Sequence, residues 1–252
     1  MESLRLALRV AYLGSAFAGW QRQARDRTVQ GVLESALEVL YGQPVAVVGA
    51  GRTDAGVHAT GQVAHLDPPR SIPPQGVASA LNSLLPGDVR VLRAWVVPDA
   101  FHARRSALGK RYRYRLAWGA TLPPWEAERR WQVNHPLDAA VMAATLGAVS
   151  GRHDFAAFAL AGHSGHGARG TGRVVTRAHL SHRGRRADLV LEGDGFLRGM
   201  VRRIAGALVE VGRGAQPPTW FKALLRDPLV RPPAPTAPAR GLTLERVFYR
   251  RQ

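Results

Sequence analysis

The 252-residue sequence contains no cysteine. Disulfide bonds, thiolate zinc sites and a catalytic thiol are therefore excluded, while the redox compartment is left open. No run approaches 18 apolar residues, so no membrane-spanning helix is expected. The N-terminal segment 1–9 alternates apolar and polar residues, which does not fit a secretory signal, and a cytoplasmic protein is the expectation.

Acidic residues are also scarce, with 18 against 35 lysines and arginines and a formal net charge of +17. Only Lys110 and Lys222 are lysines, so arginine carries nearly all of the positive charge. Arginine binds phosphate through paired donors and stacks on bases. A GC-rich codon bias would explain the ratio of arginine to lysine but not the net excess. The charge therefore indicates a polyanionic partner, and nucleic acid is the first candidate for an enzyme or a binding protein alike.

Hydrophobic periodicity predicts the order of the secondary-structure elements. Alternation of apolar residues predicts strands at 4–12, 43–48, 61–67, 89–97, 110–118, 173–180, 186–192 and 242–249. Helical spacing predicts helices at 29–40 behind an N-cap at Thr28, and at 75–85, 137–149, 196–211 and 218–225. The Pro-rich stretch 231–238 is predicted to be a loop, and the Gly- and His-rich stretch 162–172 a mobile surface loop.

The order strand, helix, strand, strand occurs twice, with a break near residues 105–110. This repetition predicts an α+β protein of two similar halves, each a mainly antiparallel sheet with helices on one face. The N-terminal half is expected to span residues 1–107 and the C-terminal half residues 108–252.

The glycine-rich segment 49–58 reads Gly-Ala-Gly-Arg-Thr-Asp-Ala-Gly-Val-His. It fails the dinucleotide fingerprint because Asp54 stands where the third glycine is needed, and it fails the Walker A pattern because Val57-His58 replaces Lys-Ser/Thr. What remains is a tight turn that presents one carboxylate. By composition alone, a lone Asp in such a loop is more often a turn residue than a catalyst. Neither Asp54 with His58 nor His163 with His166 has enough spaced ligands for a metal site.

Several further motifs occur in order along nearly the whole chain. They are Tyr12-Leu-Gly14, Gly19-Trp-Gln21, Thr28-Val-Gln30, Gly51-Arg-Thr-Asp-Ala-Gly-Val-His58, Phe101-His-Ala-Arg104, Lys110-Arg-Tyr112, Gly195-Phe-Leu197, Met200-Val-Arg202 and Gly241-Leu-Thr-Leu244. Together they resemble the A-type tRNA pseudouridine synthases, which act on the anticodon stem-loop. The sequence departs from that family at Leu13, where Asp is usual, and at Leu66, where Phe is common.

The resemblance implies an enzyme that isomerises uridine to pseudouridine at tRNA positions 38–40, with no cofactor and no metal. It implies Asp54 as the nucleophile and Arg202 as the ion-pair partner of its carboxylate. It places Tyr112 against the target uracil, in an active-site cleft between the two halves. The partner implied is tRNA, and the family forms homodimers.

Three arginine or histidine side chains complete the candidate site. The resemblance assigns Arg52 to displacing the target nucleotide, a step that costs a few kcal/mol of lost stacking. Arg198 and His58 are included as candidate substrate-contacting residues, although His58 is expected to serve mainly the structure of the loop.

Tyr114, two residues after Tyr112 in the strand, is expected to belong to the core. Arg202 lies about 140° from the apolar stripe of its helix, so core packing does not explain it.

Three alternatives remain open. A non-enzymatic RNA-binding protein would explain the charge but not an Asp within a basic surface. A metal-dependent nuclease would need clustered carboxylates, which the sequence lacks. The same isomerisation at other uridines, in tRNA or ribosomal RNA, would leave the chemistry unchanged.

Overall fold

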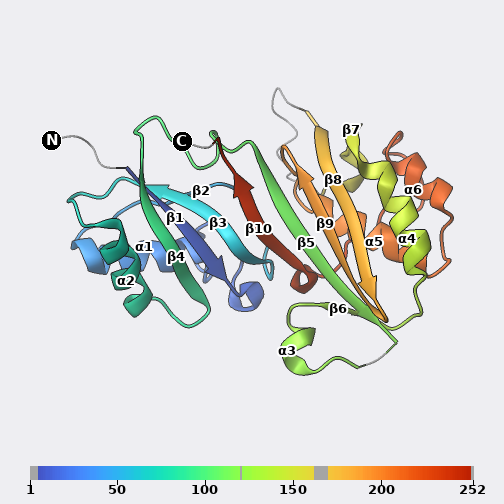
Figure 1. The fold of residues 1–252 in the computed structure, drawn as a ribbon, viewed down its shortest axis with the longest axis horizontal. Coiled ribbons are helices and arrows are strands. Elements are labelled where there is room, and N and C mark those ends of the chain that lie inside the picture. The colour runs from blue at the N-terminus through green and yellow to red at the C-terminus, as the bar shows by residue number, and fades with distance from the viewer. Residues whose placement is uncertain (1–4, 120, 162–169, 251–252) are drawn as a thin grey trace. The chain divides into compact units, whose positions relative to one another are not determined.

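The computed structural model describes residues 5–119, 121–161 and 170–250, which form an α+β fold with mainly antiparallel strands (Figure 1). This class is the one that the sequence predicts. The chain forms two compact units: unit 1 comprises Met1–Leu108 with Leu244–Gln252, and unit 2 comprises Gly109–Thr243. The cleft expected between the two halves stays a prediction.

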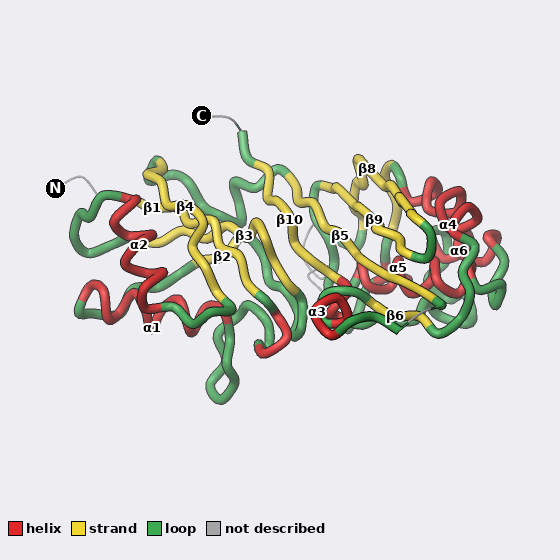
Figure 2. Tube along the Cα trace, turned by 60° about the horizontal axis from the view of Figure 1, so that its bottom comes forward, coloured by secondary structure: helices red, strands yellow, loops and turns green. Residues whose placement is uncertain are grey.

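Unit 1 contains a sheet with the strand order β4-β1-β3-β10, and β2 also pairs with β3. Its strands are β1 (Arg5–Tyr12), β2 (Val48–Gly49), β3 (His58–Leu66), β4 (Val89–Val97) and β10 (Leu242–Phe248, in unit 1 from Leu244). Its helices are η1 (Gly14–Ala16), α1 (Val29–Tyr41) and α2 (Pro74–Leu84), of which α2 packs on β4 and α1 on α2 (Figure 2). The division expected at 107/108 placed Leu244–Gln252 in the second half, but this segment joins unit 1 because β10 lies beside β3.

Helix α1 begins and ends as its sequence indicates. The side chain of Thr28 accepts a hydrogen bond from the backbone N–H of Gly31 at 3.2 Å, and Gly42 closes the helix with a left-handed φ of 75°. The strand predicted at 43–48 is mostly wrong, because only Val48–Gly49 pair with β3. The backbone N–H of Val47 donates instead to Oε1 of Glu34 on α1, at 3.1 Å. Val45 and Val47 are buried, so an irregular segment shows the alternation that is typical of a strand.

Unit 2 contains a second antiparallel sheet with the strand order β5-β9-β8-β7, and β6 joins β5 in parallel. The strands are β5 (Gly109–Trp118), β6 (Trp131–Val133), β7 (Gly151–Asp154), β8 (Gly172–Arg183) and β9 (Arg186–Gly193). The helices are α3 (Pro124–Ala127), α4 (Ala139–Leu146), η2 (Gly147–Val149), η3 (Ala156–Phe158), α5 (Met200–Gly212), α6 (Pro218–Leu224) and η5 (Ala239–Gly241). Helix α4 packs on β8, α5 packs on β5, and both contact α6.

Helix α5 begins at Met200, four residues later than predicted. Gly199 adopts a φ of 72°, a left-handed conformation that stops the helix from extending toward Phe196. The apolar stripe expected on this helix is buried at Val201, Ile204, Leu208 and Val211. The loop predicted at 162–172 falls largely outside the described residues. Within the described chain, no helix is long and apolar enough to cross a membrane.

A buried histidine in unit 1 links folding to pH. His65 is 5% exposed, and its Nδ1 accepts a hydrogen bond from the backbone N–H of Ala103 at 3.2 Å. Burial, followed by the charges of Arg5 and His102, lowers the pKa of His65 below its ordinary value, although Asp67 acts in the opposite direction. The folded chain therefore binds this proton less readily than the unfolded chain does.

We expect the stability that depends on neutral His65 to be complete above about pH 6.5 and to fall as the pH drops below that value. Thermal unfolding followed by circular dichroism between pH 8 and pH 5 would measure it, with a decrease in Tm on the order of a few °C. The variant His65→Gln keeps a polar side chain but does not titrate, so its pH profile should be flatter over this range. An unchanged slope in the variant would contradict the assignment to His65.

Candidate active site

Asp54 lies in a tight turn that connects β2 to β3. The backbone N–H of Val57 donates to the carbonyl oxygen of Asp54 at 3.2 Å, and Gly56 has a φ of 77°. A positive φ at the third position is what a type II turn requires, and glycine adopts it without strain. The sequence Asp-Ala-Gly-Val therefore folds locally into a turn that begins at the candidate nucleophile.

The end of β1 and the segment that follows it hold this turn in place through hydrogen bonds to Thr53 and Gly56. The backbone N–H of Trp20 donates to the carbonyl oxygen of Thr53 at 3.1 Å, and the Tyr12 hydroxyl hydrogen-bonds Oγ1 of Thr53 at 2.8 Å. The backbone N–H of Gly56 donates to the carbonyl oxygen of Phe17 at 3.3 Å. Burial raises the pKa of Tyr12, so this hydroxyl stays protonated and keeps the hydrogen bond. The residues on both sides of Asp54 are therefore fixed by the body of unit 1, while Asp54 itself is half-buried.

Two glycines allow this close approach. A Cβ atom on Gly14 would overlap the carbonyl oxygen of Val57, and one on Gly19 would lie only 2.6 Å from the carbonyl oxygen of Thr53. Gly19 also has a φ of 104°, which other residues rarely adopt. The motifs Tyr12-Leu-Gly14 and Gly19-Trp20 thus support the Asp54 turn from a distant part of the sequence.

We expect Gly14→Ala to displace the turn and to lower the free energy of unfolding by about 1–3 kcal/mol, as overpacking against backbone does. The loss of activity should exceed what the loss of stability alone would cause, because the displaced turn carries Asp54. Urea denaturation and pseudouridine formation at 25 °C would measure the two effects. Gly87→Ala is the matched control, since an added Cβ meets no atom within 4 Å there. Equal activity in the two variants would contradict the supporting role of Gly14.

The other two candidates in this loop have different surroundings. Arg52 is exposed, and its Nε donates to Oε1 of Gln21 at 3.1 Å, so the guanidinium is oriented but accessible. His58 is only 2% exposed, and its Nδ1 accepts a hydrogen bond from the backbone N–H of Gly14 at 3.0 Å. Because the backbone N–H of Gly14 already occupies Nδ1 of this ring, the geometry favours the structural role expected for His58.

In unit 2, Tyr112 lies on β5 opposite Leu191 of β9. Its ring is 8% exposed and meets the ring of Phe196 edge-on, with centroids 5.1 Å apart and planes at 80°. The Phe196 segment is fixed by Asp194, whose Oδ1 accepts from the backbone N–H of Val174 at 3.0 Å. Phe196 belongs to the motif Gly195-Phe-Leu197, but its role could not be predicted because an edge-on ring contact leaves no periodic signal in the sequence.

Tyr114 is fully buried, as expected for a core residue. Its hydroxyl donates to the carbonyl oxygen of Pro238 at 2.8 Å, and its ring meets Trp131 at 89°. Burial raises the pKa of Tyr114 despite the positive charges of Arg202 and Arg240 nearby. Arg202 therefore lies near the buried face of β5, where its positive charge opposes the rise in the pKa of Tyr114.

Arg202 is in the first turn of α5 and is held by the segment that precedes β10. Its Nε donates to the carbonyl oxygen of Ala237 at 2.8 Å, and the backbone N–H of Ala237 donates to the carbonyl oxygen of Arg202 at 3.2 Å. Gly206, one turn further along, contacts the carbonyl of Pro235, where a Cβ would not fit. Residues 235–237 therefore cover the side of α5 that carries Arg202, which packing of the apolar stripe did not explain.

Arg198 precedes α5 and is exposed, and its Nη1 donates to the carbonyl oxygen of Ala161 at 3.1 Å. Unit 1 thus brings Arg52, Asp54 and His58 together at one loop, and unit 2 brings Arg198 and Arg202 to the start of one helix. Among the described residues, no group of three or more histidine and carboxylate side chains could hold a metal ion.

Known proteins resemble this chain over most of its length. A family model described as tRNA pseudouridine synthase matches residues 9–104 and 147–250, which include Asp54 and Arg202. The chain belongs to this family. The match omits residues 105–146, which include all of β5 and therefore Tyr112.

Relatives cover nearly the whole chain. The tRNA pseudouridine synthase A of Myxococcus xanthus is 44% identical over 98% of this chain and 92% of its own length. Those of Solidesulfovibrio magneticus and Geobacter sulfurreducens are 47% and 40% identical, over 97% and 99% of this chain and 91% and 100% of their own lengths. A chain in the crystal structure of a Cbf5–Nop10–Gar1 complex aligns with 81% of this chain and 45% of that chain, at 14% identity and a TM-score of 0.34, too low for the folds to be compared.

Proposed function

We propose that this chain is a tRNA pseudouridine synthase that isomerises uridine to pseudouridine in the anticodon stem-loop. The observation that carries this proposal is the full-length similarity to proteins named tRNA pseudouridine synthase A, combined with an Asp54 turn that unit 1 holds through Tyr12, Trp20 and Thr53. Positions 38–40 are the proposed targets because the motifs resemble those of the anticodon-loop enzymes.

The reaction exchanges one bond to the ribose for another. The bond between N1 of uracil and C1′ of the ribose breaks, the base rotates, and a bond forms between C5 and C1′. The hydrogen on C5 leaves as a proton, and N1 gains a proton, so the overall change is an isomerisation. No electrons are gained or lost and no group donor is needed. A carboxylate suits this chemistry because it is ionised at neutral pH and can add to the sugar or the base, or assist departure of the base.

Each candidate residue has a proposed role in this reaction. Asp54 is the nucleophile, and Arg202 supplies the positive charge that balances it. Tyr112 stacks on the target uracil, which its location on β5 with a ring fixed by Phe196 supports. The exposed guanidinium groups of Arg52 and Arg198 contact the RNA, and Arg52 helps to displace the nucleotide from the stem. We also propose a cytoplasmic homodimer, on the basis of the family resemblance.

Release of tritium from tRNA labelled at C5 of uracil tests the proposed function, because the C5 hydrogen leaves only when the new carbon–carbon bond forms. Unmodified tRNA transcripts with single uridines at positions 38, 39 or 40 would identify the preferred site. Binding without tritium release would favour a non-enzymatic RNA-binding protein. Strand cleavage that stops with a chelator would favour a metal-dependent nuclease.

A further inference from the structure

Unit 2 carries a dense set of charges on the sheet face opposite Tyr112 and Tyr114. Along β5, Arg111, Arg113 and Arg115 alternate with these tyrosines, so the arginines share the other face of the strand. The strand register continues this face across the sheet. Glu192 and Arg177 lie in line with Arg111, Val190 and His179 with Arg113, Asp188 and Ser181 with Arg115, and Arg186 and Arg183 with Ala117.

We call the charged side chains of these rows, with Glu126 and Arg130 that bind them, the arginine face. It contains seven arginines (Arg111, Arg113, Arg115, Arg130, Arg177, Arg183 and Arg186) and three carboxylates (Glu126, Asp188 and Glu192). Within this set, seven positive charges against three negative ones leave a surplus of four. This surplus is a substantial share of the net charge of +17 on the whole chain.

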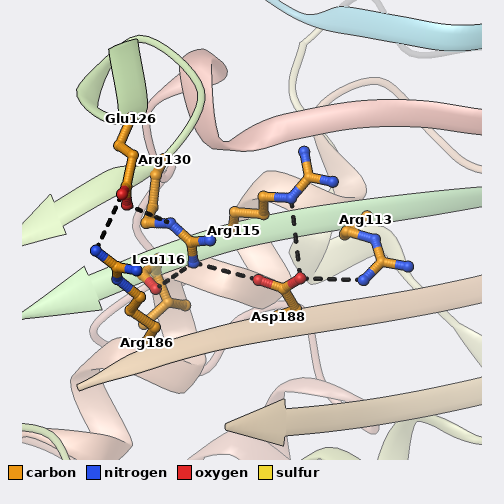
Figure 3. A network of polar contacts seen from close by, with 7 residues as sticks. All are labelled: Arg113, Arg115, Leu116, Glu126, Arg130, Arg186 and Asp188. Atoms are coloured by element: carbon orange, nitrogen blue, oxygen red, sulfur yellow. Dashed lines mark hydrogen bonds and ion pairs between the residues drawn. The ribbon is translucent and has the colours of Figure 1, made fainter. Parts of the chain in front are cut away.

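The carboxylates organise these arginines rather than neutralise them. Asp188 is the centre of one network, with ion pairs of 3.0 Å to Arg113, 3.8 Å to Arg115 and 3.2 Å to Arg130 (Figure 3). Glu126 extends the network to Arg186 at 3.0 Å (Figure 3). Glu192 pairs with Arg111 at 2.9 Å and with Arg177 at 3.5 Å. Guanidinium groups that are held in this way lose little conformational freedom when they bind a further anion.

The outer part of the arginine face is open to solvent. The side chains of Arg177 and Arg186 are each 55% exposed, and His179 and Arg183 are also exposed. Because arginine offers five donors in a rigid fork, its pairing with a carboxylate is compatible with a second contact to phosphate. Arg177, Arg183 and Arg186 are therefore the residues of this face that an approaching polyanion meets first.

We infer that the arginine face binds the sugar–phosphate backbone of the tRNA, on the side of β5 opposite Tyr112. Two properties select this partner. The symmetric interface of a dimer places one patch against its own copy, and a surplus of four positive charges on each copy opposes that contact. The strand rows contain no aromatic side chain except His179, so the sheet surface itself offers little for stacking on unpaired bases, and phosphates of a helical stem are the fitting ligand. The inference rests on the proposed function, since it assigns a further contact to the same substrate.

The test compares two triple variants that remove equal charge. R177Q/R183Q/R186Q removes the exposed arginines of the arginine face. R70Q/R213Q/R226Q removes three exposed arginines from other surfaces. Binding of an unmodified tRNA transcript would be measured by filter binding from 50 to 300 mM salt, and kcat and KM by tritium release.

For the first variant we expect the Kd at 150 mM salt to rise about tenfold or more. The log–log dependence of affinity on salt should become shallower by about two, since each lost phosphate contact removes 0.7–0.9 from the slope. The value of kcat at saturating tRNA should not change, and the second variant should alter Kd less than about twofold. R183Q alone should produce about one third of the change in slope, and it leaves the ion pairs of Arg177 and Arg186 in place.

Equal effects of the two triple variants would overturn the inference. So would a first variant that keeps its salt slope but changes its mass in light scattering, which would identify the arginine face as a contact between copies of the chain. If the wild type forms no pseudouridine, the proposed function fails. If it does form pseudouridine and the two variants bind alike, only this inference fails.

Discussion

Asp54→Asn is expected to abolish pseudouridine formation while it leaves tRNA binding nearly unchanged. An amide has the size and shape of the carboxylate but cannot act as a nucleophile, and loss of a nucleophile typically costs about 10⁴-fold or more in rate. The turn should survive, because the hydrogen bonds made by the Asp54 carbonyl, the backbone of Thr53, Gly56 and Val57, and the Thr53 hydroxyl all remain in this variant. Single-turnover tritium release and filter binding with the same tRNA preparation would measure the two properties.

Asp99→Asn is the matched control, since it makes the same chemical change at an exposed carboxylate elsewhere in unit 1. It should retain the wild-type rate. A substantial rate in Asp54→Asn would show that Asp54 is not the nucleophile, which is the main role that the family resemblance implies. Loss of binding in proportion to loss of rate would show that Asp54 holds the RNA, which is a different role.

Local sequence signals predicted most of the secondary structure because the interactions that form it are also local. Thr28 caps α1 through a hydrogen bond to a residue three positions later, and the predicted strands at 173–180 and 186–192 pair through a tight turn at Gly184-Arg185. The alternation of tyrosine and arginine on β5 reflects one covered and one charged face. In each case the residues that determine the structure lie within a few positions of one another.

The errors arise where a distant part of the chain decides the conformation. The segment 43–47 shows the alternation of a strand, but Glu34 on α1 takes a backbone donor that a strand would use. The start of α5 depends on Gly199, whose positive φ accompanies close contact with the side chain of Leu160. The partner of β10 cannot be deduced from its own residues, so the sequence alone assigned Leu244–Gln252 to the wrong unit.

The candidate site was predicted from motifs, and the structure adds what supports each residue. Nothing in the spacing of Gly14 indicates that it touches Val57 or that it donates a hydrogen bond to His58. In the same way, Phe196 lies 84 positions from Tyr112 along the chain yet meets its ring at 5.1 Å. Contacts of this kind position a catalytic group but leave no periodic pattern in the sequence.

Arg202→Ala is expected to lower the rate of pseudouridine formation by on the order of 10²–10³-fold. If Arg202 balances the Asp54 carboxylate, its removal leaves that charge uncompensated, at a cost of up to about 3–5 kcal/mol, the value for a fully buried pair. The substitution also removes the hydrogen bond from Nε to the carbonyl oxygen of Ala237, so a loss of rate alone would not separate charge from structure.

Two further variants separate them. Arg202→Gln retains a donor for Ala237 without the charge, and Arg202→Lys retains the charge with different geometry. If charge is the function, the lysine variant should be clearly more active than the glutamine variant, while circular dichroism shows both folded with similar Tm. A double-mutant cycle with Asp54→Asn tests the pairing directly, because coupled residues give non-additive effects. Binding of tRNA is the property to measure in this cycle, since Asp54→Asn alone should have no measurable rate. Additive effects on binding, together with equal activity of the lysine and glutamine variants, would show that Arg202 acts independently of Asp54 and serves to hold residues 235–237 against α5.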